Sequence, residues 1–140
     1  MTNAIVLPDE SGGGGGGSGA GHMTIVIGDG DSSIPNGTTG FSAPIPFGGS
    51  ITGWTIAEVS NPPVACSIEV EIWKTTLAGY PPDPGDVISG TEPPELVADT
   101  VQVNNSLSTW TSAYVAEDCF GFKVVSTDNL AKKIAIVLKM

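Results

Sequence analysis

The segment "CSIEVEIWK", Cys66–Lys74, alternates apolar and polar side chains along its whole length. Successive residues of a β-strand point to opposite faces, so this alternation predicts a strand that is buried on one face only. The side chains expected to point inward are Cys66, Ile68, Val70 and Ile72, and those expected to point outward are Ser67, Glu69, Glu71 and Trp73. An apolar strand face needs a second layer of structure to cover it, so this segment predicts a packed β-sheet protein.

Strand-like runs of the same kind lie on both sides of this segment. They are "MTIVIGD" from Met23, "FSAPIPF" from Phe41, "SITGWTIAEV" from Ser50, "ELVADTVQV" from Glu95, "SLSTWTSAYV" from Ser106, "CFGFKVV" from Cys119 and "KIAIVLKM" from Lys133. The prolines of the second run suit an irregular or edge strand. The Asn-Asn pair at 104–105 is a hairpin-like turn signal. Because no segment predicts a helix, we expect an all-β fold, an antiparallel β-sandwich of jelly-roll type.

The bulk composition excludes several classes of function. The chain has 140 residues, 19 Gly, 11 Pro and a net charge of −10, and its five basic residues are all lysines. Binding to nucleic acid or to an anionic membrane surface requires a basic face, so we expect neither partner. No apolar run approaches the ~20 residues that span a bilayer. The N-terminus "MTNAIVLPDE" lacks the basic region of a secretory signal.

The glycine-rich segment "SGGGGGGSGAGH", Ser11–His22, divides the chain into an N-terminal arm, residues 1–22, and a β-sandwich domain, residues 23–140. Consecutive glycines carry the largest backbone entropy and no side chain to offset it, so we expect a flexible tether. Such a tether would span ~20 Å root-mean-square. The apolar residues Ala4, Ile5, Val6 and Leu7 then read as an anchoring peptide that docks elsewhere. The sequence Gly-His-Met that ends at Met23 also resembles an expression-vector scar, which leaves an artificial origin open.

No residue pattern predicts catalysis, a metal site or a cofactor. The single histidine, His22, ends the tether, so the Ser-His and Cys-His arrangements of nucleophilic catalysis are missing. The outward pair Glu69 and Glu71 reads as a solvated strand face, since a glycosidase needs two acids on opposite sides of a sugar. Two cysteines, Cys66 and Cys119, are too few for a zinc site, and the sequence leaves a disulfide between them open. We therefore expect a protein that is not an enzyme.

Two aromatic residues lie in or beside a proline-stiffened loop, "KTTLAGYPPDPGDVI", residues 74–88. Trp73 directly precedes the loop, and Tyr80 lies within it. An exposed aromatic pair on such a loop suits contact with a sugar or a protein. The alternative interpretation is that Trp73 packs on a neighbouring subunit and that Tyr80 holds its own loop against the sheet.

Three segments together resemble a β-sandwich domain that recurs in structural proteins of tailed bacteriophages. They are "ITGWTI" at 51–56, "IEVEIWKTTLAGYPPDPGDVISG" at 68–90 and "LSTWTSAYVAEDCFGFKV" at 107–124, and the opening from Thr24 fits the same family. The resemblance covers nearly all of residues 24–140. It departs at Glu71, where an Asp is common, at the turn Glu117-Asp118-Cys119, and at Gly121, where a polar residue is common.

The resemblance implies a location in the virion and leaves the role within it open. The first expectation is a capsid-decoration, cement or head-fibre protein, which is homotrimeric, contacts other capsid or tail proteins, and is anchored by its N-terminal arm. The alternative is a tail-fibre or receptor-binding module that recognises host surface glycans. In either case the Trp-Lys…Tyr-Pro-Pro loop reads as a structural corner of the domain.

Overall fold

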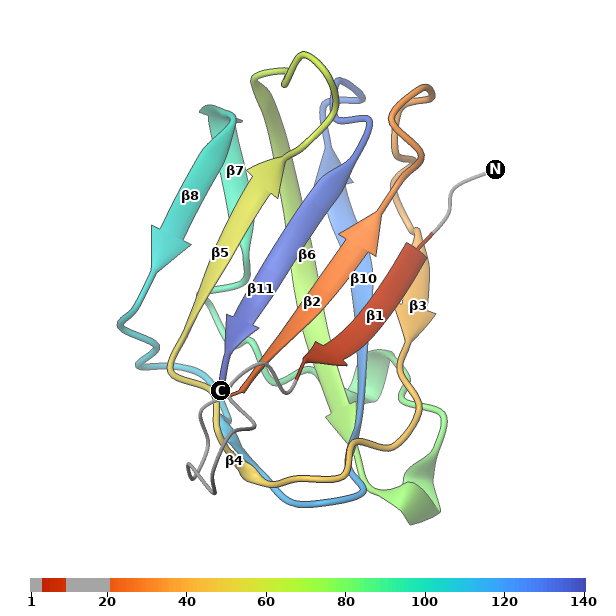
Figure 1. Cartoon of the computed structure of the whole chain (residues 1–140), viewed down its shortest axis with the longest axis vertical. Helices are drawn as coiled ribbons and strands as arrows, with labels where there is room; N and C mark the ends of the chain where they lie inside the picture. Colours follow the sequence, from red (N-terminus) through yellow and green to blue (C-terminus); the bar gives the residue numbers. More distant parts are fainter. Residues whose placement is uncertain (1–3, 10–20) are drawn as a thin grey trace.

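Two antiparallel β-sheets pack face to face in the computed structural model, which describes residues 4–9 and 21–140 (Figure 1). The first sheet has the strand order β1-β2-β11-β5-β8, and the second has the order β3-β10-β6-β7. The strands of the first sheet are β1 (Ala4–Asp9), β2 (His22–Ile27), β11 (Ile134–Lys139), β5 (Gly53–Glu58) and β8 (Val101–Asn104). The strands of the second sheet are β3 (Thr39–Phe41), β10 (Cys119–Thr127), β6 (Cys66–Thr75) and β7 (Glu95–Asp99). The predicted β-sandwich is confirmed, while the jelly-roll type stays a prediction.

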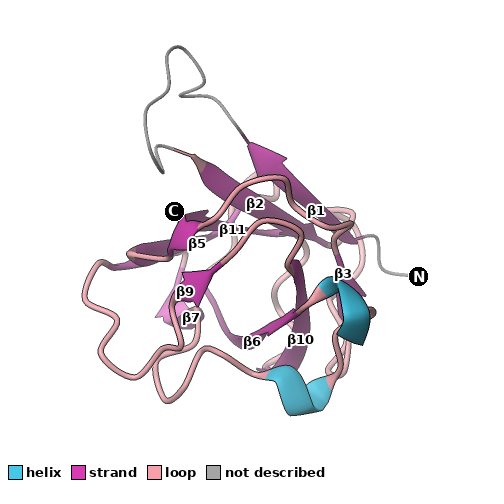
Figure 2. Ribbon diagram, turned by 90° about the horizontal axis from the view of Figure 1, so that it is seen from below, coloured by secondary structure: helices cyan, strands magenta, loops and turns pink. Residues whose placement is uncertain are grey.

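A short third sheet closes one end of the sandwich. It pairs β4 (Gly49–Ser50) with β9 (Ala113–Tyr114). Two single-turn 3-10 helices, η1 (Leu77–Gly79) and η2 (Pro84–Asp86), lie in the connection from β6 to β7 and are the helical turns seen in Figure 2. In the described part of the chain, no helix is long and apolar enough to cross a membrane.

The core lies between the two sheets and follows the alternation of the strands. On β6 the inward residues Cys66, Ile68, Val70 and Ile72 are buried, while Ser67, Glu69 and Glu71 are partly exposed, as predicted. On β11 the buried positions are Ile134, Ile136 and Leu138. Trp73 is the exception on β6, because it has outward parity and is nevertheless buried.

Three expected segments differ from the structure. Of the run "FSAPIPF", only Phe41 lies in a strand, at the end of β3. The run "ELVADTVQV" is two strands in different sheets, because the chain turns at Thr100 and passes from the second sheet to the first. Ala98 adopts a positive φ of 50° just before this turn. The Asn-Asn pair therefore makes no hairpin: β8 ends at Asn104 and pairs with β5. In the run from Ser106, only Ala113–Tyr114 forms a strand.

The two cysteines lie too far apart to form a disulfide. Cys119 is the register partner of Thr75, at the end of β6 opposite to Cys66. The nine residue steps from Cys66 to Thr75 span about 30 Å along a strand, whereas bridged cysteines need Cα atoms less than about 7 Å apart. Both thiols are free and buried, and burial raises the pKa of the Cys66 thiol to about 11.

The N-terminal residues Ala4–Asp9 form the edge strand β1 of the first sheet (Figure 1). They pair antiparallel with β2, so the backbone of the expected anchoring residues Ala4, Ile5, Val6 and Leu7 docks on its own domain in this structure. His22 begins β2 instead of ending the arm. Of the glycine-rich tether predicted for Ser11–His22, residues 11–20 lie outside the described residues.

Candidate binding cleft and the aromatic corner

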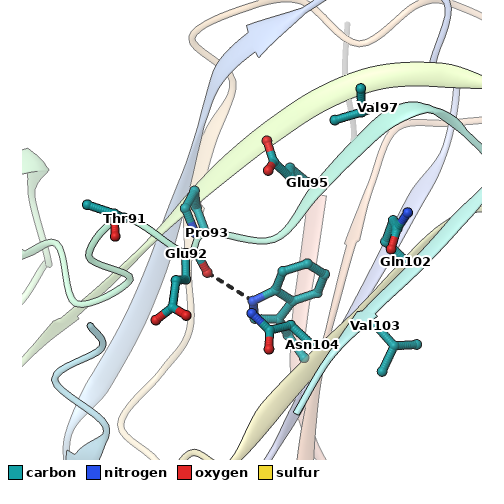
Figure 3. A pocket seen from close by; sticks show the side chains of 9 residues that line it. Thr91, Glu92, Pro93, Glu95, Val97, Gln102, Val103 and Asn104 are labelled. Atoms are coloured by element: carbon teal, nitrogen blue, oxygen red, sulfur yellow. Dashed lines mark hydrogen bonds between the residues drawn. The ribbon is translucent and has the colours of Figure 1, made fainter. Parts of the chain in front are cut away.

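A cleft of about 370 Å³ lies where the edges of the two sheets meet (Figure 3). One wall comes from β7, the edge strand of the second sheet, and the other from β8, the edge strand of the first sheet. The segment that precedes β7 closes one end. The residues that line the cleft are Trp54, Thr91, Glu92, Pro93, Glu95, Val97, Gln102, Val103 and Asn104.

Two tryptophans from distant parts of the chain hold the segment that precedes β7. The indole nitrogens of Trp54 and Trp110 both donate to the carbonyl oxygen of Glu92, at 3.0 and 2.8 Å. Both rings are almost completely buried, and buried indole N–H groups need such acceptors. The shared acceptor ties β5 and the segment before β9 to one point beside the cleft.

The Glu92 side chain is held by residues other than the two tryptophans that bind its backbone carbonyl. Its Oε1 atom accepts from the backbone nitrogen and the hydroxyl of Thr109, at 2.7 and 2.8 Å. These bonds, together with bonds from Ser108, lower the pKa of Glu92 below its ordinary value. Glu92, one of the residues that line the cleft, is therefore an anion held in one position.

The remaining polar groups of the cleft are amides and one more carboxylate. Gln102 and Asn104 come from β8, and Glu95 comes from β7 (Figure 3). The Oδ1 atom of Asn104 accepts from the Ser106 backbone nitrogen at 2.8 Å, which orients this amide. Two carboxylates repel anions, while amides and carboxylates hydrogen-bond hydroxyl groups. The cleft chemistry thus suits a neutral, hydroxyl-bearing ligand better than a phosphate or sulfate.

The predicted aromatic pair divides into one buried and one exposed residue. Trp73 is only 4% exposed, and its indole nitrogen donates to Glu71 Oε1 at 2.9 Å. A Cβ atom built on Gly121 would lie 3.1 Å from both the Trp73 ring and Pro82, so the ring and the proline pack over this glycine. The prediction that Trp73 is exposed is therefore wrong. The ring packs against residues of its own chain. Gly121, which has no side chain, provides the space for the ring.

Tyr80 is 46% exposed and packs edge-on against Phe41 of β3, with ring centroids 5.5 Å apart and planes at 86°. This contact fits the interpretation that Tyr80 holds its own loop against the sheet. Phe41 is also about half exposed. The exposed aromatic pair of this surface is thus Phe41 with Tyr80.

The sequence interpretation missed the cleft because its residues carry no local motif. Trp54 and Trp110 are 56 positions apart, and their convergence on Glu92 depends on the sheet order. Among the described residues, no three His, Cys, Asp or Glu side chains gather in a group that could hold a metal ion.

Comparison with known proteins gives little further information. No protein-family model matches the chain, and no curated protein matches it. One solved structure, the N-terminal cellulose-binding domain of Cellulomonas fimi β-1,4-glucanase C, aligns with 98% of this chain and 85% of its own chain. The sequence identity is 12% and the TM-score is 0.29.

Proposed function

We propose that this chain is a non-enzymatic bacteriophage virion protein of the capsid-decoration or head-fibre type, anchored by its N-terminal arm. The family resemblance of residues 24–140 supports a place in the virion. The observation that carries the proposal is the position of Ala4–Asp9, which join the sandwich as an edge strand at the end of a glycine-rich connection. A strand attached in this way is suited to joining one small domain to others in a lattice, and many copies multiply weak contacts.

Co-sedimentation with particles stripped of this protein tests the proposal. The full chain is expected to pellet with the particles, and a variant that lacks residues 1–20 is expected to remain in the supernatant. Circular dichroism of the truncated variant checks that its sheets persist without β1. Equal pelleting of the two chains, together with a monomeric full chain in solution, would contradict the anchored, trimeric arrangement.

The second candidate is a tail-fibre or receptor-binding module that recognises host surface glycans. The specific observation in its favour is the cleft, where Gln102, Asn104 and Glu95 present groups that hydrogen-bond sugar hydroxyls beside the edge of Trp54. The exposed Phe41–Tyr80 pair offers a second surface for stacking on a sugar.

A host-cell binding assay separates the two surfaces. If the cleft binds glycan, Asn104→Ala should weaken cell binding at least tenfold, while Tyr80→Ala should leave it unchanged. If the aromatic pair binds, the two results should be reversed. Asn36→Ala, at an exposed position that belongs neither to the cleft lining nor to the aromatic pair, is the matched control. Absence of cell binding by the full chain would remove this candidate.

A further inference from the structure

The β2 edge of the first sheet is an acceptor for an extended segment. β1 pairs with it over six positions, from Ala4 opposite Ile27 to Asp9 opposite His22. The side chains of Met23, Ile25 and Ile27 on β2 are fully buried, so the core fixes this strand. Main-chain hydrogen bonds supply most of the affinity when a strand adds to a sheet edge. Without an added strand, β2 would present a row of unpaired backbone groups.

The connection between β1 and β2 is much longer than this pairing needs. A two-residue turn can join antiparallel strands whose ends lie opposite each other. Here residues 10–21 intervene, twelve positions of which eight are glycine. Closing a twelve-residue loop is about fifteen-fold less probable than closing a two-residue loop, by the three-halves power of length. A Gly-rich chain of twelve residues has a root-mean-square span of ~19 Å.

The length of the connection therefore allows β1 to reach a more distant acceptor than its own β2. A tether too short to span the distance to a site gives almost no effective concentration there, whereas a tether whose root-mean-square length approaches that distance gives a usable one. Fully extended, twelve residues reach ~40 Å, and a domain of this size is about 35 Å across. The β2 edge of an adjacent copy is thus within reach.

We propose that β1 is an exchangeable strand: Ala4–Asp9 of one copy occupies the β2 edge of a second copy in place of that copy's own β1. Both arrangements make the same strand contacts, which is why exchange of an identical element is a low-cost route to oligomers. The tether sets the balance between them. Self-pairing through a flexible linker of this kind corresponds to a local concentration of about 1 mM, so exchange takes over when copies are held together at or above that concentration.

This inference goes beyond the proposed function, because it names a second copy of this chain as the partner of the arm and holds for the protein in solution. A particle that binds many copies would favour the exchange by crowding them. Exchanged arms would link neighbouring domains to one another, which also accounts for a multimeric assembly.

Disulfide trapping between two full-length variants tests the exchange. Ile5→Cys in one chain and Val26→Cys in a second, differently tagged chain occupy opposite positions of the β1–β2 register. The two proteins are mixed at micromolar and at millimolar concentration, equilibrated and oxidised. We expect the disulfide-linked dimer of the two different chains to rise at least tenfold in yield at the higher concentration. The native thiols are buried and compete little.

The matched control pairs the Ile5→Cys chain with a Val101→Cys chain. Val101 is half exposed and lies on β8, at the opposite edge of the same sheet. A yield of mixed dimer no higher than that of this control, or a preference for dimers of two Ile5→Cys chains through edge-to-edge contact, would overturn the proposal. Leu7→Cys with Thr24→Cys, the neighbouring register pair, replaces the first pair if a variant does not fold. No particle is present, so the outcome is independent of the co-sedimentation result.

Discussion

Trp73 donates its indole hydrogen to Glu71, two residues earlier on the same outward face of β6, with a nitrogen–oxygen distance of 2.9 Å. The bond satisfies the polar edge of a ring that is otherwise covered by Pro82 and by the backbone of Gly121. The outer face of the second sheet is therefore covered at this corner by its own β6–β7 connection. The proline-rich loop therefore shields Trp73 from solvent.

Truncation of Trp73 should cost far more stability than truncation of Tyr80. Trp73→Ala removes a buried ring and leaves a cavity, and we expect a loss of about 3–5 kcal/mol in the free energy of unfolding. Tyr80→Ala removes a half-exposed ring and one edge-on contact worth about 0.5–1.5 kcal/mol. Urea denaturation followed by tryptophan fluorescence or circular dichroism measures both. Equal losses would show that Trp73 does not pack as described.

Glu58 should make stability depend on acid pH. Its buried carboxylate accepts hydrogen bonds from Ser60 Oγ at 2.6 Å and from the backbone nitrogens of Val64, Lys132 and Lys133 at 3.0, 3.0 and 3.2 Å. Burial alone raises the pKa of Glu58, but these bonds outweigh it and lower the pKa to about 2. Because the folded value lies below the unfolded one, this stabilisation is complete above about pH 4.5 and is lost as the pH falls towards 2.

The carboxylate of Glu58 is therefore expected to contribute about 3 kcal/mol at neutral pH. Glu58→Gln should remove most of this contribution and flatten the stability profile between pH 4.5 and pH 2. Glu117→Gln, at an exposed turn position, is the control and should leave the profile unchanged. Denaturation midpoints measured across this range decide the matter, and an unchanged slope in Glu58→Gln would contradict the assignment.

Relief of a repulsive pair should stabilise the second sheet. Glu69 of β6 and Glu95 of β7 are direct register partners. Burial, followed by the charges of Glu95 and Glu71, raises the pKa of Glu69. Because the pKa of Glu69 is higher in the folded state than in the unfolded state, the group favours folding at low pH, where it is protonated. This contribution to stability disappears as the pH rises through the folded-state pKa. Glu95→Gln should therefore raise the free energy of unfolding by about 0.2–1 kcal/mol at pH 7 and by almost nothing at pH 3. Thermal unfolding at the two pH values measures both changes. Equal gains at both would refute the charge explanation.

Two glycines with nearly the same backbone conformation should respond differently to alanine. Gly28 and Gly30 have φ of +97° and +88°. A Cβ on Gly28 would collide with the carbonyl oxygen of Lys132 and lie 3.1 Å from Ile34, whereas a Cβ on Gly30 meets no atom within 4 Å. Gly30→Ala should cost roughly 1–2 kcal/mol from backbone strain alone, and Gly28→Ala should cost clearly more. Similar losses in chemical denaturation would show that the Lys132 turn moves freely.

Strand parity was the part of the fold that could be predicted best. The alternation in Cys66–Lys74 correctly assigned the inward and outward faces of β6, since a pleated strand with one covered face allows no other placement. The run Glu95–Val103 was misread because a change of sheet within a continuous apolar run leaves no local signal. Its two halves are buried by different layers, which only the packed structure defines.

The sequence by itself determined that this chain is a β-sandwich and where most of its strands lie, because side-chain alternation is a local property of an extended backbone. Only the tertiary structure decided that Trp73 is covered, that Trp54 and Trp110 converge on the Glu92 carbonyl beside a polar cleft, and that Ala4–Asp9 close the β2 edge. Each of these depends on segments far apart in the chain. Their meeting is set by the free energy of packing the whole domain, which no short stretch of residues encodes.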